Sequence, residues 1–190
     1  MSAPPADPQR GAFVLLDDDA LIGAGCTIQD AATVGAASIG DGASICAHAS
    51  VADGVSIGRD SVVGDQATVE PAAAVGELSV VGRGARVGAR ARVGARVRLQ
   101  TNATLGEDVV VDDDAFVGPG ASAGAAAALG RACRIGAAAR IAPGVAVGAE
   151  AFVAAGAVVE ADVPPRAVMI GAPARHVRDV PDEDLIENFR

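Results

Sequence analysis

Aliphatic residues recur every six positions through most of this chain of 190 residues. In steps of six from Ile39 to Val159 there are 21 positions, of which 20 are Ile, Leu or Val, and the exception is Ala123. Amphipathic helices repeat apolar residues every three or four positions and simple strands every two, so neither explains this period. Sustained from Ile39 to Val159, it is an internal repeat of the kind found in solenoids. It predicts an all-β fold, a parallel β-helix in which three hexads close one triangular coil.

A second inner position is expected four residues after each aliphatic one. On one face of the coil it is always alanine, at Ala49, Ala67, Ala85, Ala103, Ala121, Ala139 and Ala157. Only a small side chain is expected to fit there. Glycine often follows the aliphatic residue directly, as in Ile135-Gly136, where it is expected to supply the unusual φ of a tight turn. The step from Val34 to Ile39 is one position short of the regular six, so we expect a bulge or corner adjustment at residues 35–38.

The composition agrees with a narrow core filled by small aliphatic side chains. The chain is 51% hydrophobic, yet it has four Phe and neither Trp nor Tyr. One elongated domain is therefore expected. We predict a flexible N-terminus over residues 1–11, the β-helix over 12–165, and a C-terminal connection with a short helix over 166–190.

Targeting signals and cysteine chemistry are not expected. The opening MSAPPADPQR has no basic segment, and the apolar run from Ala12 to Leu16 is too short for a signal peptide or a membrane span. The expectation is a cytoplasmic protein with no membrane partner. Cys26, Cys46 and Cys133 are odd in number and lack Cys-x-x-Cys pairing, so they are interpreted as structural thiols.

Six arginines and no acid lie between residues 83 and 98, although the formal net charge of the chain is −9. They are Arg83, Arg86, Arg90, Arg92, Arg96 and Arg98. With three hexads in a coil, this basic belt wraps around the solenoid and forms no single stripe. A nucleic-acid groove would combine a continuous basic patch with aromatic stacking platforms, so no nucleic-acid partner is expected. Three alternatives remain for what the belt contacts, namely a compact polyphosphate, acidic surfaces on neighbouring subunits, or solvent alone.

Residues 162–178, DVPPRAVMIGAPARHVR, resemble the ending of the hexapeptide-repeat acyltransferases, D-V-P-x-x-x-x-x-x-G-x-P-A-x-x-x-R. The matching residues are Asp162, Val163, Pro164, Gly171, Pro173, Ala174 and Arg178. The resemblance implies a left-handed β-helix, although parallel crossovers are ordinarily right-handed. It also implies a homotrimer with acyl-CoA sites between adjacent subunits.

A narrower resemblance covers about residues 97–178. VRLQTNATLGEDVVVDDDAFVGPGAS, residues 97–122, is similar to a stretch of the nucleotide-sugar 3-amino N-acetyltransferases. The matching residues are Gln100, Asn102, Asp113, Phe116, Gly118 and Pro119. Three features depart from that family. Thr101 replaces the first Asn of its Asn pair, the hexad at 29–34 lacks its aromatic and His side chains, and the hexad period continues where it inserts a loop over the nucleotide sugar.

Outward positions three residues after the aliphatic one form a column along the predicted solenoid. They are His48, Gln66, Gly84, Asn102, Gly120, Ala138 and Gly156. Acyl transfer from a thioester needs an unprotonated nucleophile, donors to the developing oxyanion, and a general acid or base. We predict Asn102 and His48 as candidate catalytic residues, about 14 Å apart along one subunit. The candidate substrate-binding residues are Gln100, Thr101, Gly84, Gly120 and Asp113.

Candidate contacts to coenzyme A lie toward the C-terminal coils. Outward arginines could pair with the phosphates of this polyanion, and the candidates are Arg134, Arg140, Arg166 and Arg175. Gly136 and Ala154 would give the pantetheine arm access to the backbone. The alternative for these arginines is a role in solubility alone. No metal is expected. A carbonic-anhydrase site on this architecture needs three His, and the chain has only His48 and His176. Asp112, Asp113 and Asp114 are interpreted as a solvated turn.

Taken with the resemblance, these residues indicate an acetyl-CoA-dependent N-acyltransferase. An amine acceptor needs less assistance than a hydroxyl, so the shortage of His favours N-acylation of an amino sugar, nucleotide-linked or not, or of a similar small amine. The alternative is a catalytically silent hexapeptide scaffold. In the tail, Pro181 is predicted to begin a helix, with Leu185, Ile186 and Phe189 on its apolar side.

Overall fold

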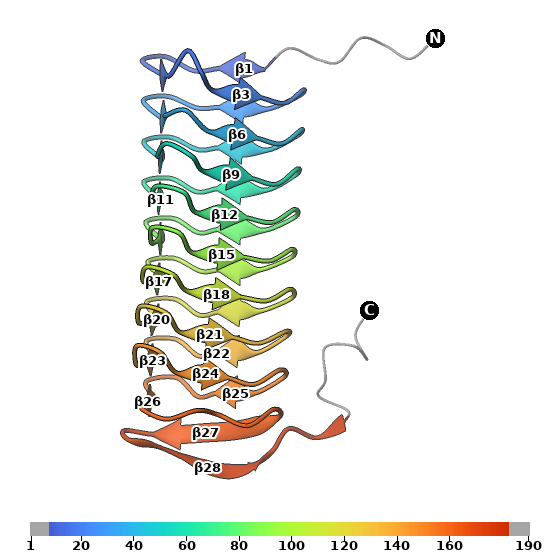
Figure 1. Cartoon of the computed structure of the whole chain (residues 1–190), viewed down its shortest axis with the longest axis vertical. Helices are drawn as coiled ribbons and strands as arrows, with labels where there is room; N and C mark the ends of the chain where they lie inside the picture. The colour runs from blue at the N-terminus through green and yellow to red at the C-terminus, as the bar shows by residue number, and fades with distance from the viewer. Residues whose placement is uncertain (1–7, 183–190) are drawn as a thin grey trace.

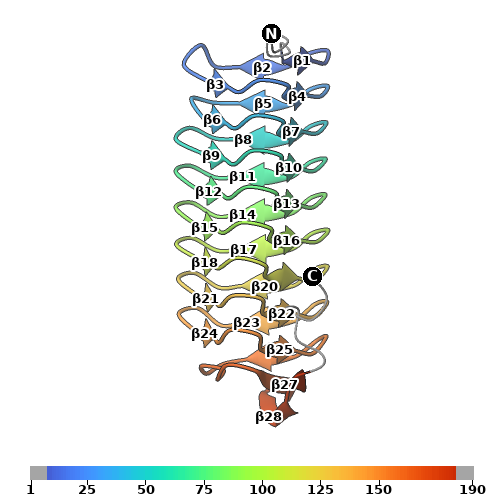
Figure 2. The ribbon, with the colours of Figure 1, turned by 90° about the vertical axis from the view of Figure 1, so that its right-hand side faces the viewer.

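The computed structural model describes residues 8–182 as one solenoid of stacked, three-sided coils (Figure 1). Within each coil, two-residue strands alternate with tight turns, and each strand joins one of three sheets that run along the solenoid (Figure 2). Neighbouring coils pair in parallel. The coiling is that of a left-handed β-helix, as the resemblance implied.

The three sheets are called A, B and C. Sheet A contains β1 (Gln9–Arg10), β4 (Thr27–Ile28), β7 (Ser44–Ile45), β10 (Val62–Val63), β13 (Val80–Val81), β16 (Arg98–Leu99), β19 (Phe116–Val117), β22 (Arg134–Ile135), β25 (Phe152–Val153), β27 (Ala167–Gly171) and β28 (Ala174–Asp179). Sheet B contains β2 (Leu15–Leu16), β5 (Thr33–Val34), β8 (Ser50–Val51), β11 (Thr68–Val69), β14 (Arg86–Val87), β17 (Thr104–Leu105), β20 (Ser122–Ala123), β23 (Arg140–Ile141) and β26 (Val158–Val159). Sheet C contains β3 (Leu21–Ile22), β6 (Ser38–Ile39), β9 (Ser56–Ile57), β12 (Ala74–Val75), β15 (Arg92–Val93), β18 (Val110–Val111), β21 (Ala128–Leu129) and β24 (Ala146–Val147).

The register confirms the predicted coil of three hexads. Val87 pairs with Val69 on one side and Leu105 on the other, each three hexads away along the chain. All three side chains are fully buried. The predicted adjustment near residues 35–38 is a corner shortened by one residue, because strands on either side of it pair one position short of three hexads, as in Thr27 with Ser44.

The core is the inner stack of aliphatic and small side chains. The alanine column predicted from the sequence is buried, with exposures of 0% or 1% at each of its seven positions. Cys26 and Cys133 occupy small inner positions and are buried, whereas Cys46 lies partly exposed at a corner. These placements follow from the period alone.

Two inner positions carry serine, and these hydroxyls connect successive coils. Ser61 Oγ donates to the Gly76 carbonyl at 2.8 Å and accepts the Ser79 N–H at 3.1 Å. Ser79 Oγ donates to the Gly94 carbonyl at 2.9 Å and accepts the Val97 N–H at 3.0 Å. Both serines are buried, so this chain of hydrogen bonds lies inside the solenoid wall.

Glycine after the aliphatic residue has a different role from the one predicted. Gly136 does not have a positive φ. A Cβ there would lie 2.5 Å from the backbone nitrogen of Ala155 in the next coil, closer than packed atoms allow. The glycine therefore permits close approach between coils, and the expectation of a special φ at this position was wrong.

The positive φ occurs two residues later in each turn, in the outward column. His48 has φ 58°, Asn102 57° and Ala138 55°, and the glycines of the same column have 62° to 69°. This left-handed conformation is natural for Gly, tolerated by Asn and costly for most other residues. Each corner between sheets A and B therefore presents its third residue at the tip.

The ends of the solenoid differ from the predicted boundaries. The first strand, β1, begins at Gln9, so the β-helix starts earlier than residue 12. At the other end, β27 pairs with β25 in parallel, and β28 folds back antiparallel on β27. The matched ending motif thus forms a hairpin closing sheet A, because Gly171, with φ 103°, and the following Pro173 reverse the chain.

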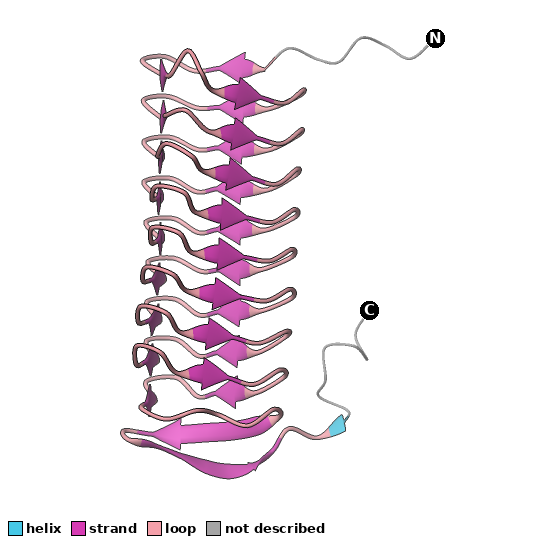
Figure 3. Ribbon diagram, in the orientation of Figure 1, coloured by secondary structure: helices cyan, strands magenta, loops and turns pink. Residues whose placement is uncertain are grey.

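Helical structure is nearly absent from the described part of the chain (Figure 3). Asp182 is a single 3-10 residue, and the strand β28 has already ended at Asp179. The predicted helix from Pro181 lies, beyond its first two residues, outside the described residues. No helix in the described part is long and apolar enough to cross a membrane.

Candidate functional site

The candidate catalytic residue Asn102 lies at the corner between β16 and β17. Its Oδ1 occupies the space that a Cβ on Gly84 would fill, one coil toward the N-terminus. On the other side, a Cβ on Gly120 would meet nothing within 4 Å. The amide oxygen therefore rests against Gly84, and the Cβ position of Gly120 is open.

The backbone supplies a structural reason for asparagine here. Asn102 has φ 57°, and its N–H donates to the Arg83 carbonyl at 2.9 Å. Asparagine adopts this conformation more readily than other non-glycine residues. The residue therefore satisfies a turn as well as presenting an exposed amide.

Four of the five candidate substrate-binding residues lie around Asn102. Gln100 and Thr101 belong to the same turn, in which the Gln100 carbonyl accepts the Ala103 N–H at 3.0 Å. Gly84 and Gly120 are its column neighbours. Asp113 does not join them, since it follows β18 at a corner between sheets C and A.

His48 stands in the same column, three coils from Asn102 toward the N-terminus. It is exposed, has φ 58°, and its N–H donates to the Asp30 carbonyl at 3.0 Å. Gln66 and Gly84 lie between the two candidates. The structure does not bring His48 and Asn102 together within one chain.

The candidate coenzyme A residues divide over separate parts of the C-terminal coils. Arg134 faces outward from sheet A and Arg140 from sheet B. Arg166 donates to the Val180 carbonyl at 3.1 Å and pairs with Asp182. Arg175 lies on β28 and donates to the carbonyl of its neighbour Ala174. A single chain therefore does not gather the four guanidinium groups into one anion site.

The two small candidates for pantetheine contact share one corner. Gly136 and Ala154 each follow a sheet A strand, one coil apart. Both belong to the corner between sheets A and B that also carries Asn102. Both are half-buried.

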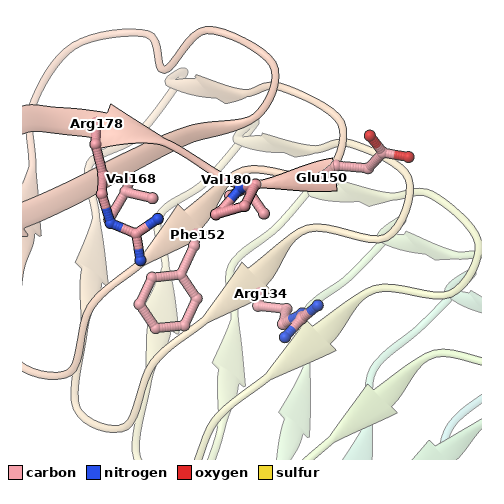
Figure 4. A pocket seen from close by; sticks show the side chains of 7 residues that line it. Arg134, Glu150, Phe152, Val168, Arg178 and Val180 are labelled. Atoms are coloured by element: carbon pink, nitrogen blue, oxygen red, sulfur yellow. The ribbon is translucent and has the colours of Figure 1, made fainter. Parts of the chain in front are cut away.

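A hollow of about 230 Å³ lies where the terminal hairpin meets sheet A (Figure 4). Arg178 on β28 reaches toward the ring of Phe152 on β25, and Arg134 projects from the next strand. The remaining lining residues are Glu150, Val168, Val180 and Pro181. The hollow combines basic and apolar groups, and only Arg134 among them was a predicted site residue.

The basic belt is largely paired with acids of adjacent coils in the same chain, which was not among the predicted alternatives. Arg83 pairs with Asp65, Arg86 with Glu70, Arg90 with Glu107 and Asp108, and Arg96 with Asp113 and Asp114. The hydrogen bond from Arg90 lowers the pKa of the Asp108 carboxyl. Four of the six arginines thus connect coils within the chain, each exposed pair contributing little stability by itself.

The acidic run at residues 112–114 is not a freely solvated turn as expected. Asp113 Oδ1 accepts the Ala95 N–H of the preceding coil at 2.8 Å, and the Asp114 side chain, 10% exposed, pairs with Arg96. Other acids two residues after an aliphatic one cap the preceding coil in the same way, namely Asp30, Asp41 and Asp53. The sequence signal for this role was acid at a fixed turn position.

Neither metal ligation nor thiol chemistry has a group of residues to support it in the described part of the chain. No three His, Cys, Asp or Glu side chains there are placed to hold a metal ion. Burial raises the pKa of the Cys133 thiol to about 12, and desolvation also raises the pKa values of Cys26 and Cys46. His176 lies on exposed β28, with Nε2 3.0 Å from Asp179 Oδ1.

Comparison with known proteins bears on the repeat and the fold. The family model described as hexapeptide repeat of succinyl-transferase matches residues 36–65 and 127–161. No curated protein sequence matches the chain significantly. Among solved structures, UDP-N-acetylglucosamine acyltransferase from Bacteroides fragilis has a TM-score of 0.79 at 18% identity, covering 88% of this chain and 73% of that one.

Two further acyltransferases of the same description have similar folds. The enzyme from Francisella novicida has a TM-score of 0.68 at 20% identity, covering 90% of this chain and 66% of that one. The enzyme from Campylobacter jejuni has a TM-score of 0.59 at 20% identity, covering 90% and 75%. At these identities the likeness establishes the fold. The predicted resemblance to hexapeptide-repeat proteins is therefore confirmed over the matched residues, and the chain shares the left-handed β-helix fold of these solved structures.

Proposed function

We propose that this protein is an acyltransferase that moves an acyl group from a coenzyme A thioester to the amine of a small acceptor. The acceptor class that we favour is an amino sugar, free or nucleotide-linked, and the acyl group is acetyl. The observation that carries the proposal is the exposed Asn102 amide, which rests against Gly84 in a column where the next coil carries Gly120 and so no side chain. The same residue matches the Gln-x-Asn pattern that resembles the sugar N-acetyltransferases.

Comparison with solved structures supports the reaction class at a coarser level. The neighbours with similar folds are described as UDP-N-acetylglucosamine acyltransferases. The hexapeptide model named for a succinyl-transferase also points to acyl transfer. The choice of acetyl, of coenzyme A and of an amine is our proposal.

The reaction requires little from the protein beyond orientation and charge stabilisation. The neutral amine attacks the thioester carbonyl, a C–N bond forms, the C–S bond breaks, and the amine proton leaves with the departing thiol or to solvent. The Asn102 side-chain NH₂ would donate to the oxyanion that forms in between. Its Oδ1 rests against Gly84, so the NH₂ group has the open side of the turn available.

Assembly into a homotrimer is part of the proposal, because the site residues of one chain are incomplete. His48 stands three coils from Asn102, about 14 Å by the usual strand spacing. A side-by-side trimer could place a second chain against this corner and bring further groups to the amide. We propose the candidate arginine Arg140, from sheet B, as a phosphate contact in such an interface.

The test is release of free thiol from acetyl-CoA in the presence of a panel of amino sugars, with and without a linked nucleotide. Asn102→Gly removes the amide and keeps the left-handed turn unstrained, so stability should hold while turnover falls by about 100- to 1,000-fold. Gln66→Gly is the matched control, since Gln66 has φ 58° in the same column and is also exposed. Full turnover by Asn102→Gly would remove this residue from the mechanism.

A catalytically silent scaffold is the second candidate, and one observation favours it. Four belt arginines are committed to acids of the same chain and so are poorly available to a ligand. If the purified protein shows no acetyl-CoA binding at millimolar donor and transfers no acetyl group to any amine, the scaffold replaces the enzyme as the conclusion. An acyl carrier protein donor should be included in the panel, because it presents its thioester on the same pantetheine arm.

A further inference from the structure

Sheet A carries an alternating ladder of arginine and phenylalanine on its outer face. Successive strands present Arg98, Phe116, Arg134 and Phe152, each paired in register with the next. Neighbouring strands lie about 4.8 Å apart, so these side chains form one continuous strip. The chain has only four Phe, and two of them stand here.

This strip is more apolar than the rest of the belt region. Leu78 is 49% exposed and Val80, the neighbour of Arg98 on the sheet, is 38% exposed. Exposed large apolar groups gathered on one face indicate an interaction surface. Sheet B, by contrast, presents mainly Thr, Ser and Arg on its outer face.

Two hollows lie along the strip and share Arg134. One, of about 530 Å³, is lined by Leu78, Arg96, Arg98, Asp114, Ala115, Phe116 and Arg134. The other is the hollow of about 230 Å³ beside Phe152 (Figure 4), and Pro181 is part of its lining. The described chain therefore ends next to one hollow, one residue after Pro181.

The chain beyond that point has the chemistry that this strip would accept. Residues 183–190 read EDLIENFR, with three acids, one arginine, and the apolar residues Leu185, Ile186 and Phe189. Acids match the guanidinium groups, and the apolar side chains match the rings. Eight residues span up to about 26 Å when extended, and Arg98 lies four strand spacings, about 19 Å, from β27.

We propose that residues 183–190 bind the Arg–Phe strip of sheet A in their own chain. Asp182 is already held by Arg166 at the end of the solenoid, so the segment starts close to the strip and its binding is intramolecular. Within residues 8–182, Arg98 makes no ion pair or side-chain hydrogen bond, and it is assigned to the acids of the segment. The strip is then a covered surface and not a site for a nucleotide.

A protease that cuts after glutamate tests this directly on the intact protein, because the segment contains Glu183 and Glu187. Release of residues 188–190 is followed by mass spectrometry. The double variant Arg98→Ala/Phe116→Ala should speed this release by about tenfold, the effect of losing about 1.4 kcal/mol of binding. Phe189→Ser should speed it similarly, and combining it with the double variant should add little.

The matched control is Arg92→Ala/Val110→Ala, which removes an exposed arginine and its exposed apolar register partner from sheet C. Its release rate should equal that of the unaltered protein. Equal thermal stability of both double variants shows that the comparison concerns docking alone.

Three outcomes would overturn the proposal. Release from the unaltered protein that is as fast as from the sheet A variant would mean that the segment is unbound. A control that accelerates release as much as the sheet A variant would assign the segment to another face. Protection that disappears when subunits dissociate on dilution would assign the strip to a neighbouring chain.

Discussion

Alkaline pH should destabilise this protein chiefly through the buried thiol of Cys133. The chain has no Tyr and no Lys, so above pH 8.5 its three cysteines and its α-amino group are the groups that titrate. Cys133 lies at an inner position with 0% exposure, and burial raises its pKa to about 12. An unfolded cysteine has a pKa of about 8.5.

The sign and size of the effect follow from proton linkage. Between the two pKa values the native thiol keeps its proton while the unfolded chain loses it. Stability from this group is therefore complete below pH 8.5 and falls by about 1.4 kcal/mol per pH unit toward pH 12. At pH 10.5, two units above the unfolded pKa, the loss from Cys133 is about 3 kcal/mol.

The assay is denaturant unfolding at pH 7.5 and pH 10.5 under reducing conditions. Cys133→Ala fits the site, because Ala115 and Ala151 occupy the same inner column in the coils on either side. Between pH 7.5 and pH 10.5, the free energy of unfolding of this variant should fall by about 3 kcal/mol less than that of the unaltered protein. Cys46 lies at a partly exposed corner, so Cys46→Ala should reduce the fall in the free energy of unfolding much less than Cys133→Ala does. An identical pH dependence in Cys133→Ala and the unaltered protein would refute the reasoning.

Two further predictions concern the solenoid wall. Val87→Asp should lower the free energy of unfolding by at least about 3 kcal/mol, because it buries an unpaired carboxylate between Val69 and Leu105. Thr68→Asp, on the outer face of sheet B, should lower it far less, and thermal unfolding of the two variants makes the comparison. Ser79→Ala should cost about 1–3 kcal/mol, because the Val97 N–H loses its hydroxyl acceptor, while Ser122→Ala, on a partly exposed outer face, should be nearly neutral in the same measurement. A Ser79→Ala protein as stable as its parent would mean that the buried hydroxyl chain contributes nothing.

The repeat determined most of the fold because each hexad constrains the next. Period, inner alanines and the shortened step together predicted the register of the coils. The terminal hairpin escaped prediction because it obeys ordinary strand pairing and not the hexad, so residues 166–179 looked like a connection. The glycine of each turn was correctly located but explained by φ, when the constraint is contact with the coil above.

The candidate site was predictable only where it repeats. Asn102 and its two glycines lie three hexads apart, so laying out the sequence by coils placed them together. The same layout contained the ion pairs, since Asp108 follows Arg90 and Asp114 follows Arg96 at the same spacing. Asp113 and the four coenzyme A arginines do not lie at multiples of three hexads from Asn102, so their distance from it depends on which of the three faces each one occupies.

Because the coils pair regularly, the solenoid has the same rise at every coil. Inserting or deleting three whole hexads would add or remove one coil and change the length of the solenoid by about 4.8 Å. The remaining coils would keep the same kinds of strand pairs and core contacts. The shortened corner at residues 35–37 shows that a corner can lose a single residue, provided that the strands after it stay in the same sheets with the same side chains pointing inward. The distance between two functional side chains in one column could therefore be changed by whole coils, while the core keeps the same pattern of residues.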